Sequence, residues 1–391
     1  MQNNLRRSVW ILIAVILVSA GAAISAIRFA PEMSASSELA GPGQQGWRLA
    51  QPVTYENLTI FPVLAAQDAD TSEFATLDEA LASGDATVTE QGNYLRRSRD
   101  GAAPQDFSSG AQVNQLVLIN RGKKPLVLLA GEVVSGGKQD RIIGKDRIVP
   151  AGAAPLPLDV FCVEHGRWTG ASPQFSAGNL MVHPSVREKA AVEQDQHQVW
   201  AAVQGDTVPI GGAAGVSSAG PVEAQAAPPR ISPNALAGAI ASAETQSYQK
   251  IYESSPIGAS VETFAQEIEH RFDRATSGLK GERVVGVVVA FGGEVAWSDI
   301  FASSQMFETY WPKLLRSYAV EASTRPAVRE RVSIEDASDF LRPATGHVTE
   351  ESEPGIYRWR EQSAGRVAEI ELDALAPEPI TLHWLRVLRA D

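Results

Sequence analysis

The chain is poor in cysteine and in positive charge, and both shortages restrict what it can be. Cys162 is the one cysteine among 391 residues, so no disulfide can form within the chain. If the protein is exported, its core must therefore be stable without covalent links. Lys and Arg number 34 against 46 Asp and Glu, which gives a formal net charge of −12. A surface that acidic repels a phosphate backbone, so we expect no nucleic-acid partner.

Recognised metal-binding patterns are also missing. The six histidines show no His-x-x-x-His spacing, and Cys162 has no Cys-x-x-Cys partner. Most zinc sites of known kinds use ligands at such spacings. The sequence therefore predicts no metal and no cofactor.

Charged residues are absent from residues 9–27, which follow Arg6 and Arg7. A helix of that length spans about 28 Å, close to the thickness of the hydrocarbon core of a bilayer. The cationic start orients residues 1–8 toward the cytoplasm and the bulk of the chain outside it. We therefore predict a single-pass anchor in the cytoplasmic membrane. The alternative is a signal peptide cut after Ala22 or Ala26, which would release a secreted protein.

The remaining chain divides by composition. Hydrophobic residues make up 44%, enough for folded cores, but two stretches are dominated by Gly, Ala, Ser, Pro and Gln. We predict a flexible tether over 28–46, a β-rich domain with a terminal helix over 47–205, a disordered insert over 206–233 and an α+β portion over 234–391. The predicted fold class is α+β, in which an antiparallel β-sandwich or jelly-roll-like domain packs with a smaller, helix-containing α+β portion.

Short apolar runs separated by Gly and Pro predict the strands of the first domain. Residues 113–119 and 126–130 are joined by the turn 120–125 and are expected to pair with each other. Residues 139–149 predict a second hairpin, which pivots at Gly144. Residues 57–66 predict a strand that Pro62 places at an edge or a bulge.

Helices are indicated by caps and by apolar periodicity. Residues 76–82 predict a short helix that ends before Gly84, and Pro184 marks another helix start. An amphipathic helix is indicated by apolar residues at i, i+3, i+4, i+7 and i+11, which are Val261, Phe264, Ala265, Ile268 and Phe272. Residues 284–291 predict a buried strand that turns at Gly292-Gly293, and Pro312 is expected to kink or interrupt a later helix.

Polar residues that suggest a site lie between residues 131 and 168. The glycine-rich turn at residues 136–141 supplies main-chain N–H groups and two cations, Lys138 and Arg141. Such a turn suits an anion-binding concavity. The predicted ligand-binding residues are Gly136, Gly137, Lys138, Gln139, Asp140, Arg141, Arg167 and Trp168. Glu132 and Glu164 are candidate general bases. The turn is not a nucleotide-binding P-loop, because Lys138 comes one place late and Gln139 replaces the Ser or Thr.

Simpler interpretations stand beside these. Charged residues in a glycine turn commonly face water, and Glu132 and Glu164 would commonly pair with a neighbouring arginine. Cys162 lies inside an apolar run, which favours a buried structural thiol over a nucleophile. Trp168 would more often cap a core than stack on a ligand.

The motif GEVVSGGKQDRI, followed by CVEHGRW, resembles the ARG and rhodanese-phosphatase-superfamily-associated domain family, in which ARG stands for ADP-ribosylglycohydrolase. The likeness continues into the segment FGGEVAWSDIF and into YWPKLLRSYA. The resemblance implies an association with ADP-ribose and phosphate chemistry, and it implies no mechanism and no catalytic residues.

Three hypotheses about function follow. The first is an extracytoplasmic, membrane-anchored module that binds a small anionic ligand of the phosphate or ADP-ribose type. The second is a hydrolase of a phosphate or ADP-ribose-like ester that uses a glutamate as general base. The third is a structural envelope protein whose polar cluster only braces the fold.

Overall fold

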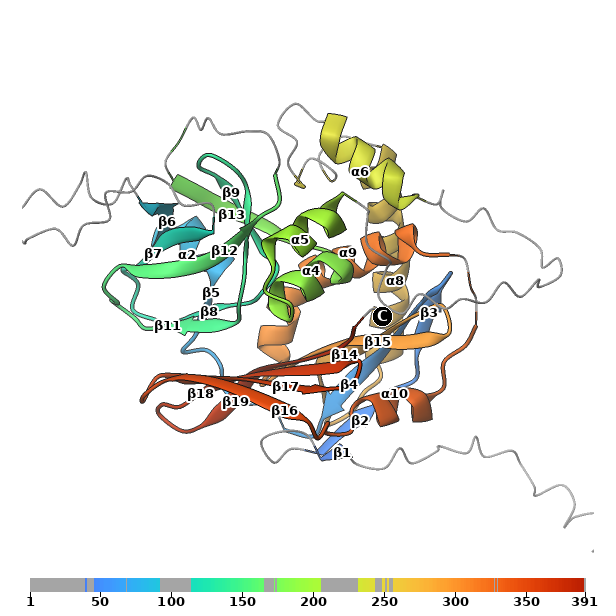
Figure 1. Ribbon diagram of the computed structural model, residues 1–391. Helices are drawn as coiled ribbons and strands as arrows, with labels where there is room; N and C mark the ends of the chain where they lie inside the picture. Colours follow the sequence, from blue (N-terminus) through green and yellow to red (C-terminus); the bar gives the residue numbers. More distant parts are fainter. Residues whose placement is uncertain are drawn as a thin grey trace, which may run out of the picture. The chain divides into compact units, whose positions relative to one another are not determined.

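Strands from both ends of the chain form one ten-stranded antiparallel sheet (Figure 1). The computed structural model describes residues 39–40, 46–67, 69–91, 114–164, 172, 174–204, 231–242, 248–249, 252, 256–326, 328 and 330–389. The order in the sheet is β1-β2-β4-β14-β15-β19-β18-β17-β16, and β3 also pairs with β4. The strands are β1 (Leu39–Ala40), β2 (Gly46–Leu49), β3 (Val53–Tyr55), β4 (Leu58–Ala65), β14 (Arg283–Phe291), β15 (Glu294–Phe301), β16 (His347–Glu353), β17 (Tyr357–Ala364), β18 (Val367–Ala374) and β19 (Ile380–Leu388).

Strand β4 lies inside this sheet, because all eight of its residues are buried. It pairs with β14 on one side and with β2 and β3 on the other. Of the two predicted positions for Pro62, an edge or a bulge, the edge is therefore wrong. A register shift between Val284 and Gly286 of β14, which pair with Leu64 and Val63, lies next to Pro62 and agrees with the bulge. Pro62 lies where β2 gives way to β3, and its carbonyl oxygen accepts a hydrogen bond from Ala50 N at 2.9 Å. The missing N–H of proline is tolerated at such a break.

Six further strands close into an antiparallel barrel in the order β10-β12-β7-β6-β13-β9. They are β6 (Ala86–Glu90), β7 (Gln115–Asn120), β9 (Glu132–Gly136), β10 (Arg141–Ile143), β12 (Leu156–Cys162) and β13 (Gln174–Met181). A separate three-stranded sheet consists of β5 (Ala75–Thr76), β8 (Leu126–Leu128) and β11 (Arg147–Val149). The barrel interior is filled by apolar side chains such as Val88, Leu118 and Val134.

Both predicted hairpins of this region are wrong. Strand β7 pairs with β6 and β12, whereas β8 pairs with β5 and β11, so the turn 120–125 leads from the barrel into the other sheet. Strands β10 and β11 separate in the same way on either side of Gly144. Asn120 stabilises the turn that leads out of the barrel. Its side-chain amide donates to the carbonyl oxygens of Lys124 and Pro150, each at 2.9 Å.

The helices follow their local signals more closely. They are α2 (Leu77–Ser83), α4 (Pro184–Ala191), α5 (Gln196–Val203), α6 (Pro233–Ser242), α8 (Pro256–Thr276), α9 (Ser304–Thr324) and α10 (Ile334–Phe340). The predicted short helix is confirmed as α2, which has a capping box of Thr76 and Glu79 and a left-handed Gly84 after its end. Helix α4 starts with Pro184 as predicted. The predicted apolar face of α8 is confirmed, because its five residues are buried in the main core.

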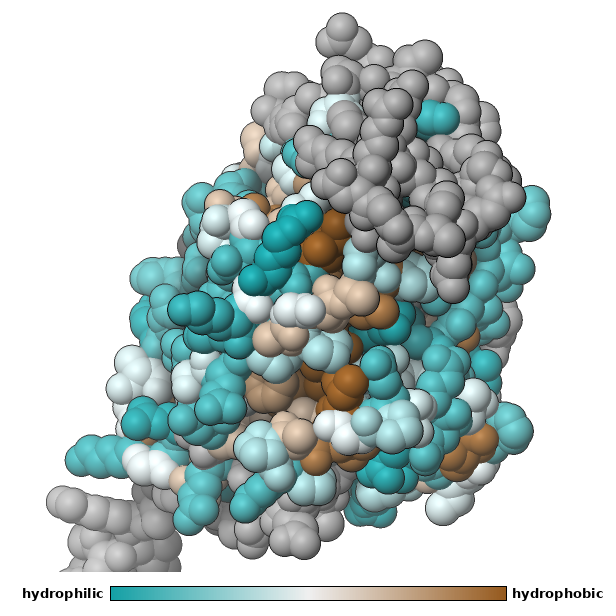
Figure 2. Space-filling view, turned by 90° about the vertical axis from the view of Figure 1, so that its left-hand side faces the viewer, coloured by the Kyte–Doolittle hydropathy of each residue, from teal (hydrophilic) through white to brown (hydrophobic). Residues whose placement is uncertain are grey.

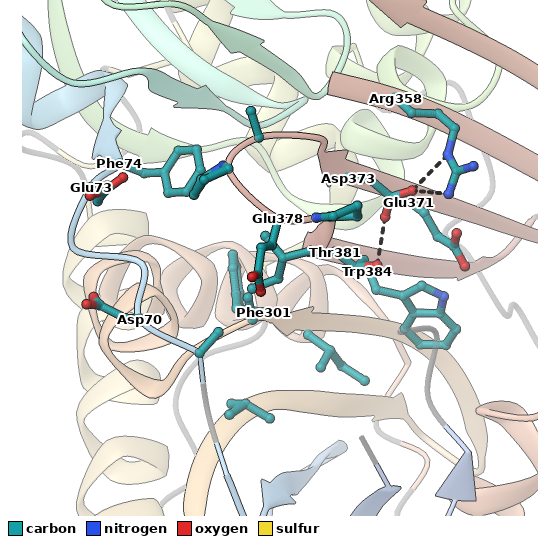
Figure 3. A pocket seen from close by; sticks show the side chains of 18 of the residues that line it. Asp70, Glu73, Phe74, Phe301, Arg358, Glu371, Asp373, Glu378, Thr381 and Trp384 are labelled. Atoms are coloured by element: carbon teal, nitrogen blue, oxygen red, sulfur yellow. Dashed lines mark hydrogen bonds and ion pairs between the residues drawn. The ribbon is translucent and has the colours of Figure 1, made fainter. Parts of the chain in front are cut away.

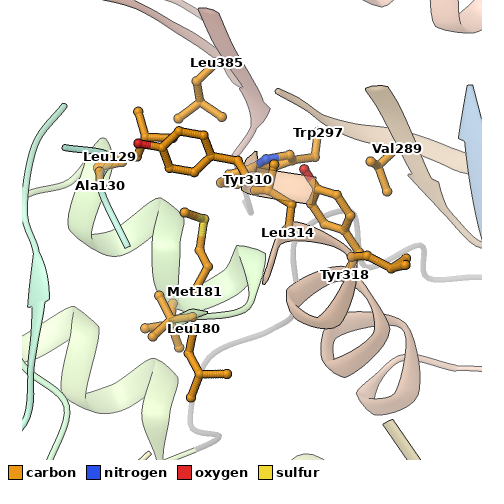
Figure 4. Packing of buried hydrophobic residues seen from close by; sticks show 14 of the residues in the cluster. Leu129, Ala130, Leu180, Met181, Val289, Trp297, Tyr310, Leu314, Tyr318 and Leu385 are labelled. Carbon is orange, nitrogen blue, oxygen red and sulfur yellow. The ribbon is translucent and has the colours of Figure 1, made fainter. Parts of the chain in front are cut away.

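Helix α9 connects the barrel to the large sheet, because it contacts both β13 and β14. It continues through Pro312, so the predicted interruption at this proline is wrong, and its apolar residues on both sides of the proline are buried. Packing of a long apolar face outweighs the one hydrogen bond that proline removes. Figure 4 shows Tyr310 and Leu314 of α9 packed between Met181 of the barrel and Leu385 of the sheet.

The fold class is thus α+β with antiparallel sheets, as predicted, and a closed barrel takes the place expected for the sandwich or jelly roll. No helix in the described part of the chain is long and apolar enough to cross a membrane. The segment 9–27, for which we predict an anchor, lies outside the described residues, as do residues 206–230 of the predicted insert.

Apolar side chains also reach the surface of the folded chain. Figure 2 shows one face on which they gather in a central band between hydrophilic ones. Among the described residues, the large hydrophobic side chain that is clearly exposed is Val348, at 47%. Single exposed side chains of this kind are common on soluble domains and need no partner.

Candidate functional site

Two polar segments that are distant in sequence lie side by side at one end of the barrel. Arg141 is opposite Cys162 in the antiparallel pair of β10 and β12. Just beyond these strands, Asp140 N donates to Glu164 Oε2 at 2.8 Å, and Val163 N donates to the Asp140 carbonyl oxygen at 3.2 Å. The structure thus brings together Asp140, Arg141 and Glu164 from the predicted set.

The turn between β9 and β10 binds carboxylates through its main chain. Gly136 N donates to Asp140 Oδ1 at 2.9 Å, and Lys138 N donates to Glu90 Oε1 at 2.9 Å. Together with the amide of Asp140, three N–H groups of residues 136–140 each hold a carboxylate oxygen of the chain. The N–H groups of this turn are thus satisfied by three different carboxylates of the chain itself.

Glycine is required at position 137 of this turn. Its φ is 52°, in the left-handed region that glycine adopts at least cost. A Cβ atom there would overlap the ring of Phe175 and approach Glu90 Oε1 to 2.7 Å. The close approach of β13 and Glu90 to the turn depends on the absent side chain.

Burial separates the residues of this cluster into two groups. Gln139, Asp140, Arg141 and Glu164 are buried, and the exposed fraction of the last two is 0%. Lys138 is only partly buried, which leaves part of it accessible to water. The two predicted residues Arg167 and Trp168 lie outside the described residues.

Cys162 is a buried thiol beside this cluster. Its Sγ lies 3.3 Å from Gln139 Oε1. Burial raises the pKa of Cys162 to about 11, and the carboxylates of Glu90 and Glu164 add to this, while Arg141 opposes it. A thiol with that pKa carries almost no thiolate at neutral pH, so it is a poor nucleophile. This agrees with the structural role expected for it.

Glu132 lies at the other end of strand β9 and has different partners. Its Oε1 lies 2.5 Å from Lys313 Nζ, and its Oε2 accepts a hydrogen bond from Leu129 N at 2.7 Å. Lys313 also pairs with Asp78 at 2.7 Å. Glu132 and Glu164 therefore have different partners, and the described residues form no shared proton-transfer site for the two.

The pKa values of this buried group follow from burial and charge. Burial raises the pKa of Glu132, and the Lys313 ammonium offsets only part of that effect. Burial lowers the pKa of Lys313, but Glu132 and Asp78 outweigh it, so the pKa lies above its usual value. One ammonium between two carboxylates stays charged.

A second buried ionic network is not predicted by the sequence. Arg187 of α4 pairs with Asp299 of β15 at 2.7 Å, and His383 of β19 joins Asp299 to Asp146. These side chains are separated by up to 237 positions, and no local pattern links them. Glu90, the partner of Lys138, was missed for the same reason. No cluster of His, Cys, Asp or Glu that suits a metal ion occurs within the residues that the structure describes.

Comparison with known proteins gives one result. No curated protein and no solved structure matches the chain. The model of the ARG and rhodanese-phosphatase-superfamily-associated protein domain matches residues 46–385, which is most of the chain and includes the barrel and the large sheet except β1 and the end of β19. This confirms the resemblance seen in the motif around Lys138. The chain belongs to the family of the ARG and rhodanese-phosphatase-superfamily-associated protein domain.

Proposed function

We propose that the protein is a binding module that holds a small anionic ligand, of the phosphate or ADP-ribose type, at the end of the barrel. The observation that supports this is the set of three main-chain N–H groups in the turn, each of which already holds a carboxylate oxygen. Phosphate oxygens use the same donors. The family description, which refers to ARG and to a phosphatase superfamily, agrees with such a ligand.

Glu90 is the internal carboxylate that a ligand would replace. Its Oε1 accepts from Lys138 N, and its Oε2 is buried without a hydrogen-bond partner in the described part of the chain. A buried carboxylate oxygen without a donor is costly, so exchange of Glu90 for a better matched anion loses little. The cations Lys138 and Arg141 would then balance the charge of the ligand.

Titration calorimetry of the full-length chain with ADP-ribose and with inorganic phosphate tests this proposal. Lys138→Ala should weaken binding by about ten- to a hundredfold, because a hydrogen bond to a charged group contributes about 1.5–3 kcal/mol. Lys123→Ala is the control, since Lys123 is an exposed lysine in the turn at the other end of β6. Glu90→Gln should tighten binding, because it removes the competing negative charge.

Melting temperatures distinguish a ligand site from a brace. If Lys138 serves a ligand, Lys138→Ala leaves the melting temperature of the free chain unchanged and abolishes its rise on adding ADP-ribose. A structural envelope protein would show the reverse, with a lower melting temperature and no response to either anion. Turnover of an ADP-ribose or phosphate ester that Glu164→Gln abolishes would instead support the hydrolase hypothesis.

We further propose that residues 9–27 hold this module at the cytoplasmic membrane, with residues 28–46 as a tether. Their length without charge supports this. Fractionation should recover the full-length chain with the membrane. A soluble mature chain that starts after Ala22 or Ala26 would show a cleaved signal peptide instead.

A further inference from the structure

A cavity of about 740 Å³ lies away from the barrel end, against the large sheet (Figure 3). It is lined by the segment before α2, by the end of β15 and by strands β17 to β19 with the turn between β18 and β19. Its volume falls in the range of small-molecule sites, about 300–1,000 Å³. None of the residues proposed for the anion site lines it.

The two arginines of the lining are already neutralised. Arg358 donates to Asp373 Oδ2 from Nε at 2.9 Å and from Nη2 at 2.6 Å. Arg360 pairs with Glu371, and Thr381 Oγ1 donates to Asp373 Oδ1 at 2.7 Å. Figure 3 shows Arg358, Asp373 and Thr381 joined on one side of the cavity. These arginines offer little net charge to a ligand.

Three more carboxylates line the cavity, and none of them forms an ion pair with a cation of the described residues. They belong to Asp70, Glu73 and Glu378, all of which are exposed. Asp70 Oδ1 accepts a hydrogen bond from Ser72 N at 2.9 Å, which does not cancel its charge. Five carboxylates against two guanidinium groups make the lining negative, within a chain of net charge −12. Such a site concentrates cations and repels anions.

Apolar groups supply the other half of the lining. Phe74 is half-buried and lies in the wall together with Pro377, Pro379 and Ile380. Phe74 also packs against the main core, which holds its ring in place. The face of an aromatic ring attracts a cation, and the prolines and isoleucine can cover an apolar body.

We propose that this cavity binds a small organic cation, whose charged group lies against the acidic lining at Glu378 and whose apolar body contacts Phe74. The proposal does not depend on the anion site, because the two sites share no residue and take ligands of opposite charge. Loss of one would leave the other intact.

The test uses three probes with the same ring and different charge. Titration calorimetry of the full-length chain should detect saturable binding of phenethylammonium, weaker binding of 2-phenylethanol by about tenfold and no binding of phenylacetate. Raising the salt concentration should weaken the binding of phenethylammonium and leave the binding of 2-phenylethanol unchanged, because salt screens exposed charges.

Two variants locate the site. Glu378→Lys should weaken the binding of phenethylammonium by about tenfold, because it reverses a charge of the lining. The control Glu269→Lys, on the exposed side of α8 and outside the lining, should leave this binding unchanged. Phe74→Leu keeps an apolar side chain and should weaken the binding of phenethylammonium by about two- to fivefold, because the aromatic ring is lost. Glu378→Lys and Phe74→Leu should not change the binding of ADP-ribose or phosphate.

The proposal is overturned if phenethylammonium does not bind, or if it binds no better than the alcohol. Equal weakening by Glu378→Lys and Glu269→Lys would also overturn it, since a general effect of net charge would then explain the result. Circular dichroism of each variant checks that the fold is retained.

Discussion

Arg187 Nη1 lies 2.7 Å from Asp299 Oδ1 and 2.9 Å from Asp299 Oδ2, and neither side chain is more than 1% exposed. Arg187 Nε also donates to the Ala130 carbonyl oxygen at 2.8 Å, while Trp297 Nε1 donates to Asp299 at 2.7 Å. Burial would raise the pKa of Asp299, but Arg187 and His383 outweigh it, so the pKa lies below its usual range. The pair thus ties α4 and the barrel side of the molecule to β15 of the large sheet.

Removing the charge of Asp299 should destabilise the protein strongly. Asp299→Asn leaves the Arg187 guanidinium buried without its counter-charge, which should lower the free energy of unfolding by about 3–5 kcal/mol. Urea unfolding followed by circular dichroism measures this. The control is Asp339→Asn, which breaks an exposed pair with Arg342 and should cost about 0–1 kcal/mol. Similar losses in the two variants would refute a special role for the buried pair.

His383 should make the stability depend on pH. Its Nδ1 lies 2.5 Å from Asp146 Oδ2 and its Nε2 lies 3.0 Å from Asp299 Oδ1. Burial lowers the pKa of His383, but the two carboxylates outweigh it and raise the pKa above its usual value. The folded chain then keeps a proton that the unfolded chain releases above about pH 6.5.

The stabilisation from His383 is therefore complete below about pH 6.5 and is lost as the pH rises toward the folded-state pKa. The slope contributed by this one group is at most about 1.4 kcal/mol per pH unit. The stability difference between wild type and His383→Gln should shrink as the pH rises. A constant difference for His383→Gln would show that its proton is not involved.

Lys313 and Glu132 should behave as one unit. Lys313→Met leaves Glu132 and Asp78 without their shared ammonium and should cost about 3 kcal/mol at neutral pH. The double variant Lys313→Met/Glu132→Gln should recover part of that loss, because the fully buried charge is then removed and only Asp78, which is partly exposed, lacks its cation. A double-mutant cycle from urea unfolding measures the interaction free energy between Lys313 and Glu132. Strictly additive losses of stability would contradict a coupling between the two residues.

The turn at the barrel end should not accept a side chain at position 137. Gly137→Ala pushes a Cβ atom into the Phe175 ring, in addition to the cost of positive φ. Gly152→Ala is the matched control, since Gly152 also has positive φ, at 63°, but has open space around it. The control should cost about 1 kcal/mol and Gly137→Ala about 2 kcal/mol more. Equal costs would mean that Phe175 moves aside freely.

Local interactions explain which elements were predictable. The capping box of Thr76 and Glu79 and the left-handed Gly84 delimit α2 by contacts within a few residues. The stripe from Val261 to Phe272 defines the buried side of α8 by periodicity alone. The same holds for the turn of Gly292 and Gly293 between β14 and β15.

Partners far apart in sequence were decided by the tertiary structure. The turn at 120–125 has the composition of a hairpin, yet β7 and β8 join different sheets, because each buries its apolar residues against other strands. Glu132 could have met a nearby arginine but pairs with Lys313, 181 positions away. The amino-acid sequence by itself determined caps, periodic faces and the polar turn around Lys138, since these depend on neighbours within a few residues. Strand partners and ion pairs came only from the folded chain, because burial of apolar surface and of charge depends on what the whole molecule places beside each residue.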